Sequence, residues 1–348
     1  MIQADNEKWM HRCIQLARNG QTGAPPNPMV GAVIVYNGKI IGEGYHRKSG
    51  EAHAEVNAIN SVHDEALLSK STLYVSLEPC SHYGKTPPCA DLIISKKIPR
   101  VVVGCIDPFA LVHGHGIEKL RHAGIEVTVG VLENECRELN KHFFTFHKKQ
   151  RPFITLKWAQ SADGFIGNDS KDGKKVFIST SHTLINVHKL RAEHQAIMVG
   201  RRTAEIDNPR LNLRFWSGRD PLRIVLDSKG RLNPNLHLFD STQPTLVVSE
   251  APFEKPASQN LEHFHPNGSS PLLPQLMAEL YRRNILSLLV EGGSQLLQSF
   301  IDANLWDNII VEFGKENMQH GVAAPVIPSC PFHIRKAWDR DFLFVHNV

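Results

Sequence analysis

The sequence contains no apolar run close to the roughly 20 residues that a membrane-spanning helix needs. Its first residues lack a basic segment followed by an apolar one, the pattern of a secretory signal, so we expect a cytoplasmic protein. Six cysteines among 348 residues are too few for a disulfide framework. The net charge of +4 is too small to indicate a nucleic-acid partner by itself. The Gly-x-Gly-x-x-Gly turn of dinucleotide-binding folds is also missing.

Length and patterning predict two soluble α/β domains. A chain of 348 residues exceeds the usual size of a single hydrophobic core, and its 41% hydrophobic and 21% charged residues are ordinary for a globular protein. Expected strands and helices alternate through both halves, which indicates sheets covered by helices. In the first half we expect helices at 7–18, 116–123 and 133–147, further helices after His53 and Cys89, and strands at 30–35, 40–45, 72–77, 100–104 and 125–129. In the second half we expect strands at 153–157, 196–199, 223–226, 245–248, 287–290 and 308–313. The basic, proline-ended stretch 148–152 marks the boundary, giving domains 1–149 and 150–348.

Two short motifs in the first half supply the side chains of a metal centre. His53-Ala54-Glu55 brings an imidazole and a carboxylate, while Pro79-Cys80 and Cys89 bring two thiols. Two thiolates and an imidazole favour zinc, and three protein ligands leave a fourth position for water. His-x-Glu followed by Pro-Cys is a known signature of zinc deaminases, in which zinc activates water and the glutamate carries protons. We therefore predict His53, Cys80 and Cys89 as metal ligands and Glu55 as the catalytic acid and base, with His53 and Glu55 on the first turn of a helix.

The segment between the two cysteines is longer than the generic deaminase pattern. Eight residues separate Cys80 from Cys89, and they are polar, basic and rich in turn formers. Because this segment adjoins the predicted ligands, we interpret it as a substrate-contacting loop, with His82, Lys85 and Thr86 as phosphate or ribose contacts. For any one of these three side chains, a solvated turn is an equally good interpretation.

Two glycine turns in the second half each follow an expected strand and indicate phosphate binding. Gly200-Arg201-Arg202-Thr203 should open a helix or turn whose free N–H groups attract phosphate, and its arginines add anion contacts. Gly292-Gly293 lets the backbone approach a pyrophosphate closely. Either turn alone is weak support, because glycine turns are common between a strand and a helix, whereas the pair is more specific.

Several motifs together resemble the family of bifunctional riboflavin-biosynthesis deaminase–reductases: Pro26-Asn27-Pro28-Met29-Val30-Gly31, Gly42-Glu43-Gly44-Tyr45-His46, Glu78-Pro79-Cys80-Ser81-His82 and 84–89. The resemblance runs through essentially the whole chain. It implies an N-terminal cytidine-deaminase-like three-layer α/β/α domain and a C-terminal dihydrofolate-reductase-like α/β domain. The first domain of this family deaminates a phosphoribosylated diaminopyrimidinone, and the second reduces the ribosyl group to ribityl with NADPH. A homo-oligomer, dimer or larger, is also implied.

The resemblance carries over further site residues. It implies that Asn27 and His46 hold the pyrimidine, and that the reductase substrate is contacted by Lys175, Arg191, Leu211, Arg214 and Glu291. It implies cofactor contacts at Ala159, Phe177, Thr203, Asp207, Ser228, Gly293, Ser294, Gln295, Leu296, Leu297, Gln298 and Ser299. The chain departs from the family pattern at 172–178, where Lys175 and Phe177 replace a small or serine-bearing turn and a tryptophan. A solvated helix arginine is the competing interpretation of Arg191.

Two other hypotheses compete with this one. A nucleic-acid base deaminase with an unrelated appended domain would show strongly salt-dependent RNA binding. A binding protein with a structural zinc would need a fourth protein ligand, for which His82 is the spare candidate.

Overall fold

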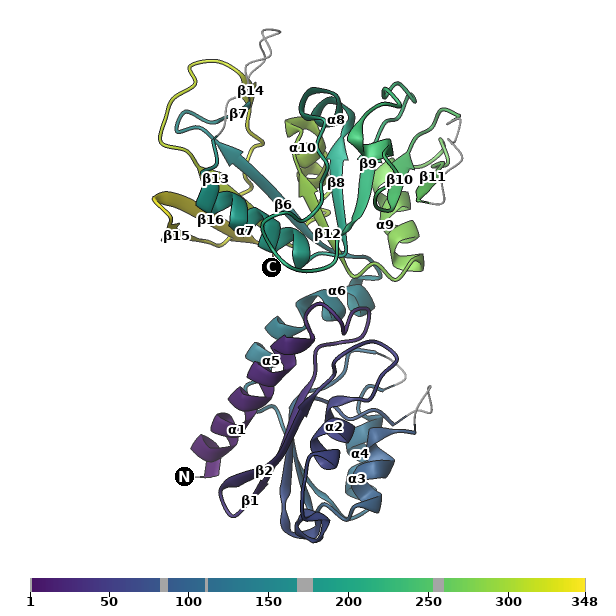
Figure 1. The fold of residues 1–348 in the computed structure, drawn as a ribbon, viewed down its shortest axis with the longest axis vertical. Coiled ribbons are helices and arrows are strands. Elements are labelled where there is room, and N and C mark those ends of the chain that lie inside the picture. The colour runs from purple at the N-terminus through teal and green to yellow at the C-terminus, as the bar shows by residue number, and fades with distance from the viewer. Residues whose placement is uncertain (1, 82–86, 110–111, 168–177, 253–259, 348) are drawn as a thin grey trace. The chain divides into compact units, whose positions relative to one another are not determined.

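The computed structural model describes residues 2–81, 87–109, 112–167, 178–252 and 260–347. The chain divides into two compact units, Met1–Gln150 and Arg151–Val348, each with its own central sheet (Figure 1). Within the described ranges, no helix combines the length and the apolar character that crossing a bilayer would require. Each unit is described by itself.

The first unit is built on a five-stranded mixed sheet in the order β2-β1-β3-β4-β5. The antiparallel strands β1 and β2 form a hairpin around Asn37-Gly38, and β3, β4 and β5 are parallel. Asn37 and Gly38 both have positive φ, as a tight two-residue hairpin requires. The strands are β1 Gly31–Tyr36, β2 Lys39–Tyr45, β3 Thr72–Leu77, β4 Arg100–Cys105 and β5 Glu126–Val129.

Alternate residues of these strands enter two separate cores, so the sheet is covered on both faces. Ile34, Val75 and Val101 pack against helices α2 (Ala54–Asn60), α3 (Cys89–Ser95) and α4 (His115–His122). Val33 and Val102 instead pack with α1 (Ile2–Ala17) and with α5 (Glu133–Leu139) and α6 (Lys141–Lys149). The period-two alternation thus produces a three-layer α/β/α unit, as the resemblance implied (Figure 1).

One expected helix is divided in two. The prediction placed a single helix at 133–147, whereas the structure has α5 and α6, which meet at Asn140. The Asn140 backbone leaves the helical region because its side chain binds Met29: Oδ1 accepts from the Met29 N–H, and Nδ2 donates to the Met29 carbonyl, both at 2.8 Å. A tertiary contact 111 residues away therefore overrides local helix propensity.

The second unit contains a nine-stranded sheet in the order β11-β10-β9-β8-β12-β6-β13-β16-β15. The strands β11, β10, β9, β8, β12, β6 and β13 are all parallel, and β16 and β15 extend the sheet as an antiparallel hairpin. The strands are β6 Phe153–Gln160, β8 Ala196–Gly200, β9 Leu222–Leu226, β10 Thr245–Val248, β11 Leu261–Phe264, β12 Ser287–Glu291, β13 Asn308–Phe313, β15 Phe332–Ala337 and β16 Arg340–His346. A small ladder joins β7 (Phe165–Gly167) to β14 (Val322–Ala323).

Helices cover both faces of this sheet as well. Alternate strand residues such as Leu288 and Val290 pack with α9 (Leu272–Arg282) and α10 (Ser294–Asp302). The opposite side chains, such as Leu289, share a core with α8 (Arg201–Asp207) and contact α7 (Ser181–Ala192). The unit is thus the α/β domain expected for the C-terminal half.

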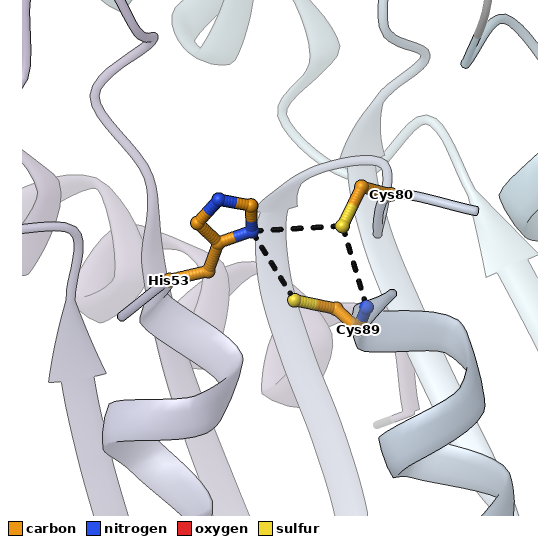
Figure 2. A group of neighbouring side chains, drawn as sticks. All are labelled: His53, Cys80 and Cys89. Atoms are coloured by element: carbon orange, nitrogen blue, oxygen red, sulfur yellow. Dashed lines mark hydrogen bonds between the residues drawn. The ribbon is translucent and has the colours of Figure 1, made fainter. Parts of the chain in front are cut away.

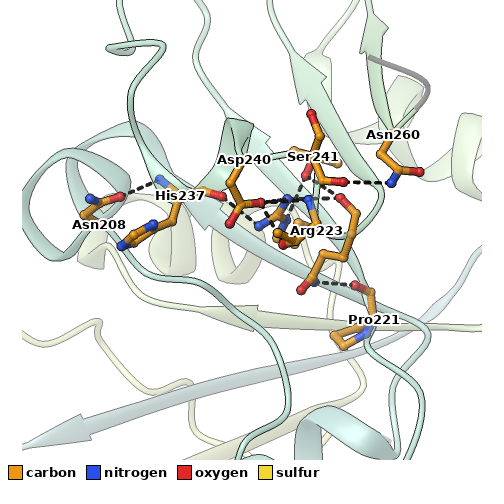
Figure 3. A network of polar contacts seen from close by, with 10 residues as sticks. Asn208, Pro221, Arg223, His237, Asp240, Ser241 and Asn260 are labelled. Atoms are coloured by element: carbon orange, nitrogen blue, oxygen red, sulfur yellow. Dashed lines mark hydrogen bonds and ion pairs between the residues drawn. The ribbon is translucent and has the colours of Figure 1, made fainter.

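A fully buried arginine fixes the segment between β9 and β10 (Figure 3). The Arg223 guanidinium donates to Thr245 Oγ1 at 2.8 Å, to the Asp240 carboxylate at 3.1 Å, and to the carbonyls of His237 and Gln243. A buried cation is tolerated only when its donors are satisfied in this way, so Arg223 ties the loop to the strand from which it departs.

Candidate active sites

The side chains of His53, Cys80 and Cys89 converge in the first unit (Figure 2). Their three ligand atoms lie within 4.8 Å of one another. His53 presents Nδ1, which is 3.5 Å from Cys80 Sγ and 3.3 Å from Cys89 Sγ. Two sulfurs and one imidazole nitrogen at this separation fit a tetrahedral zinc ion with one position left for water.

Each ligand comes from the end of an element. His53 is the N-cap of α2 rather than part of its first turn, and Glu55 is in the first turn. Cys80 follows β3, and Cys89 is the first residue of α3. The Cys89 N–H donates to Cys80 Sγ at 3.3 Å, so this helix N-terminus stabilises negative charge on that sulfur. Hydrogen bonds from Cys89 and His53 lower the pKa of Cys80 to about 4.

Glu55 is a buried carboxyl group beside the three ligands. It is 3% exposed, and burial together with the nearby Cys80 raises its pKa to about 7, against the opposing effect of His53. A carboxyl group that exchanges its proton near neutral pH can act as both acid and base. The close approach of α2 to β2 depends on Gly44, because a Cβ there would lie 2.5 Å from the Ala58 nitrogen.

Asn27 and His46 lie together in the same unit. His46 is 2% exposed, and its Nδ1 and Nε2 are each 3.1 Å from a partner, the Ala52 carbonyl oxygen and Asn27 Nδ2. Nδ1 therefore carries the proton, and Nε2 accepts. Burial lowers the pKa of His46, and its ring stands edge-on to His53 with the centroids 5.3 Å apart. The pair thus adjoins the predicted metal ligands, whereas His82, Lys85 and Thr86 lie outside the described residues.

Glu78 organises the segment that leads from β4 into α4. Its Oε2 accepts from the N–H groups of Asp107 at 3.3 Å and Gly114 at 2.9 Å. Its Oε1 accepts from those of Gly116 at 2.9 Å and Ile117 at 3.3 Å. These bonds attach the start of α4 to Glu78, which lies two residues before Cys80. The packing leaves no room for a side chain at position 116, because a Cβ there would lie 2.0 Å from the Pro79 carbonyl oxygen.

Sequence reasoning missed Glu78 and also Asp107, a second buried carboxyl group. Asp107 is 7% exposed, and burial raises its pKa to about 7. Its position two residues after β4, a strand of the parallel part of the sheet, was the available signal, because polar side chains at the carboxyl ends of such strands gather at one edge.

In the second unit, the two glycine turns lie at neighbouring strand ends. The adjacent parallel strands β8 and β12 end at Gly200 and Glu291. A Cβ on Gly292 would lie 3.1 Å from Thr203 Cγ2, and one on Gly293 would lie 3.3 Å from Thr203 Oγ1. Both glycines have positive φ, 92° and 79°, so each position favours glycine.

The strand order makes this edge a natural ligand site. From β8 the chain proceeds toward β9, and from β12 it proceeds in the opposite direction toward β13. Ligands of open α/β sheets bind where two such connections diverge at the carboxyl edge. Ser228 follows the end of β9, and Ala159 lies near the end of β6, so both reach the same edge.

The predicted stretch 293–299 contributes to this edge unevenly. The first helical bond of α10 runs from the Leu297 N–H to the Gly293 carbonyl, which leaves the N–H groups of Ser294, Gln295 and Leu296 without a helical acceptor. The side chains of Leu296 and Leu297 are buried in the core. Gln298 and Ser299 bond to protein groups, namely Asp302, the Val326 N–H and the Leu296 carbonyl. The backbone at the start of α10 is therefore what this stretch can offer to a phosphate.

The remaining predicted positions have differing surroundings. Asp207 is the exposed last residue of α8, and Leu211 is buried in the core beneath it. Lys175 and Phe177 lie outside the described residues.

A charged cluster lies on the α7 side of the sheet. Arg191 and Glu291 form a bidentate ion pair at 3.0 and 2.6 Å, and each side chain is 13% exposed. Arg191 is therefore not the solvated helix arginine of the competing interpretation. The backbone N–H of Arg214 donates to Nδ1 of buried His188 at 3.1 Å. Burial and the charges of Arg191 and Arg214 lower the pKa of His188 to about 4.

Comparisons with known proteins agree with both units. The sequence model of the cytidine and deoxycytidylate deaminase zinc-binding region matches residues 3–105, and that of the RibD C-terminal domain matches residues 152–314. The riboflavin biosynthesis protein RibD of Aquifex aeolicus is 40% identical over 331 residues, covering 93% of this chain and 90% of the relative. A crystal structure from Thermotoga maritima, of a diaminohydroxyphosphoribosylaminopyrimidine deaminase/5-amino-6-(5-phosphoribosylamino)uracil reductase, aligns with a TM-score of 0.90 and 35% identity over 100% of both chains. The Acinetobacter baumannii RibD structure aligns with a TM-score of 0.87 and 30% identity over 99% of both.

Proposed function

The chain belongs to the RibD family of riboflavin biosynthesis proteins, and on this premise we propose how its residues divide the two reactions. The protein is a bifunctional enzyme with a deaminase and a reductase activity. We assign the deaminase to domain 1–149 and the reductase to domain 150–348. The observation that carries the assignment is the convergence of His53, Cys80 and Cys89 beside buried Glu55.

In the first domain, His53, Cys80 and Cys89 would hold zinc, which supplies an activated water at neutral pH when bound. Glu55, with a pKa of about 7, would carry protons to the ring nitrogen and the departing amine of the diaminohydroxyphosphoribosylaminopyrimidine. Asn27 and His46 hold the pyrimidine, because their paired polar atoms lie beside the metal ligands. His82, Lys85 and Thr86 complete the proposed substrate contacts.

In the second domain, a nicotinamide cofactor would bind at the two glycine turns, and we propose that it is NADPH. Thr203 and the start of α10 face each other there, which suits a diphosphate. Asp207, Ser228, Ala159 and Phe177 belong to the same proposed site, together with the rest of the stretch 293–299. The cofactor would supply a hydride when bound, and these residues would fix its position against the sugar carbon.

The reductase substrate, a 5-amino-6-(5-phosphoribosylamino)uracil, would bind beside this cofactor on the α7 side of the sheet. Arg214 and Arg191 provide positive charge for the phosphate, while Glu291 orients Arg191 through two hydrogen bonds. Lys175 and Leu211 are the remaining proposed contacts. His188 fixes the backbone of Arg214 without adding charge, because it stays neutral at physiological pH.

We also propose a cytoplasmic homo-oligomer, dimer or tetramer, that acts on small molecules and not on nucleic acid. None of the six cysteines forms a disulfide, as expected in a reducing compartment. The edge strand β15 exposes Phe332 and Ile334, 65% and 59% accessible, and such apolar exposure suits contact with a second copy. The hypothesis of a base deaminase with an unrelated appended domain is not favoured, because the second unit matches a RibD reductase domain.

A coupled assay tests the proposal. Purified zinc-loaded protein receives the diaminopyrimidine ribosyl phosphate and NADPH, and ammonia release and NADPH absorbance are followed together. We expect ammonia first and NADPH oxidation only after deaminated product exists. Ammonia without NADPH oxidation would contradict the reductase assignment, and neither signal from protein with one zinc per chain would contradict both.

A further inference from the structure

Three ionisable side chains form a row across the strands β12, β6 and β13. Glu291 and Lys157 are register partners on β12 and β6, so they point to the same face. Ile310 is the register partner of Lys157 on β13, and Glu312 lies two residues farther along that strand, again on the same face. Glu291 ends β12 and Glu312 is next to last in β13, whereas Lys157 lies within β6 and is level with Glu291. The row therefore lies close to the edge proposed for the reductase ligands. The charges alternate as negative, positive, negative.

Glu312 is the one member of the row with no accessible surface. Its Oε2 accepts a hydrogen bond from Ser179 Oγ at 2.7 Å and lies 3.9 Å from Lys157 Nζ. Among the described residues, no donor lies within hydrogen-bonding distance of the other oxygen, Oε1, which is also buried. A buried carboxylate with so few donors depends on its neighbouring cation for compensation.

The other carboxylate of the row, that of Glu291, is already paired with Arg191. Both oxygens of Glu291 accept from Arg191, so this ion pair presents little net charge to Lys157. Lys157 is itself nearly buried, with 11% of its side chain accessible. Burial lowers the pKa of Lys157 below its ordinary value; the charges of Glu291 and Glu312 oppose this shift, and that of Arg191 adds to it. His188, the other titratable group near Arg191, is neutral above pH 5 because its pKa is about 4. The negative charge of Glu291 is thus largely neutralised by Arg191. The negative charge of Glu312 is not, so Glu312 is the main counter-charge of Lys157.

We propose that Glu312 is a positioning residue of the reductase site: its buried carboxylate holds Lys157 as a cation beside the end of β12 and so sets the upper pH limit of reduction. The inference rests on the proposed reductase function. A fixed cation at this edge suits a site whose two ligands both carry phosphate groups. No catalytic role falls to Glu312, because its oxygens are enclosed and act only through Lys157.

The test is the pH profile of the reductase half-reaction in Glu312→Gln, supplied with deaminated substrate and NADPH between pH 6 and 10. Loss of the negative charge removes an interaction that favours the ammonium, so Lys157 loses its proton at lower pH. We expect the alkaline limb of kcat/KM to move down by about one pH unit or more. The deaminase profile of the same preparation should not move. Glu316→Gln, which removes an exposed carboxylate of the following segment, should leave both profiles unchanged.

A second variant guards against misfolding. Glu312→Met combined with Lys157→Met removes both charges together, which a buried site tolerates far better than the loss of one partner. We expect this double variant to fold and to lack the alkaline limb. An unshifted limb in Glu312→Gln, or a limb that persists in the double variant, overturns the inference.

The inference and the proposed function fail in different ways. If the wild-type protein does not oxidise NADPH with deaminated substrate, the reductase assignment is wrong. The inference is then judged on the titration of Lys157 alone, followed by NMR of protein labelled with carbon-13 at lysine Cε and assigned with the double variant. A Lys157 pKa that is lower in Glu312→Gln than in the wild type supports it, and an unchanged pKa overturns it.

Discussion

Glu78, two residues before the proposed ligand Cys80, should control the stability of the segment that leads into α4. In Glu78→Gln, one side-chain oxygen still accepts from its two N–H groups. The new amide N–H₂ now points at the other pair, either Asp107 and Gly114 or Gly116 and Ile117. Each of these pairs contains one hydrogen bond of 2.9 Å to a charged acceptor.

The magnitude follows from those contacts. A hydrogen bond to a charged group contributes about 1.5–3 kcal/mol, and an unsatisfied buried donor adds a penalty of similar size. We therefore expect Glu78→Gln to destabilise this segment by about 3 kcal/mol. Because 1.4 kcal/mol is a tenfold change in an equilibrium constant, the amides of 114, 116 and 117 should exchange with solvent about a hundredfold faster.

Hydrogen exchange followed by mass spectrometry on peptides that cover 112–120 measures this effect. Glu118→Gln is the matched control, because Glu118 is an exposed carboxylate in the first turn of the same helix and should change exchange only slightly. Deaminase activity should fall in Glu78→Gln, while reductase activity in the other unit is retained. Wild-type exchange rates at these amides in Glu78→Gln would refute the reasoning.

Three further predictions test other parts of the molecule. Glu55→Gln should lower the rate of ammonia release at least a hundredfold while zinc content, measured by metal analysis, and the reductase rate stay the same; normal deamination would exclude Glu55 as the proton carrier. Gly292→Ala forces a Cβ at φ 92° to within 3.1 Å of Thr203, so we expect a local cost of about 1–2 kcal/mol and a several-fold higher KM for NADPH. Gly268→Ala, with open space around it, is the control in the same assay. The pKa of His188 is about 4 in the folded protein, against an ordinary 6.5. Between these two pH values the unfolded chain binds a proton at His188 and the folded protein does not, so the free energy of unfolding decreases as pH falls from 6.5 toward 4. His188→Asn should show a smaller drop in Tm between pH 7 and pH 5 than the wild type, and an equal drop would contradict this linkage.

Much of the fold was predictable, because short-range patterns decide it. The runs at 72–77, 245–248 and 308–313 form strands at those residues, since their apolar and β-branched side chains pack between two helical layers. The hairpin at Asn37-Gly38 was predictable from two residues. The antiparallel hairpin of β15 and β16 was not predicted, because β15 has almost only exposed side chains and the two buried side chains of β16, Phe342 and Val345, do not follow the period-two pattern of a strand.

The metal motif was also readable from the sequence, because its chemistry is contained in residue types and in their order. The structure adds what order cannot specify. It selects Nδ1 of His53 as the atom that faces both sulfurs, and it places His53 at the N-cap of α2 instead of its first turn. Those details depend on how α2 packs against β1 and β2, which is a long-range contact.

The sequence by itself determined the alternation of strands and helices, the two-domain organisation and the residue types available for zinc and phosphate. Only the tertiary structure decided which charges meet. Arg191 and Glu291 are 100 residues apart, Glu78 accepts from amides up to 39 residues away, and Lys157 is near Glu312 because β6 and β13 are adjacent. Such pairs are fixed by strand order and register. These are long-range properties that no local pattern of side chains encodes.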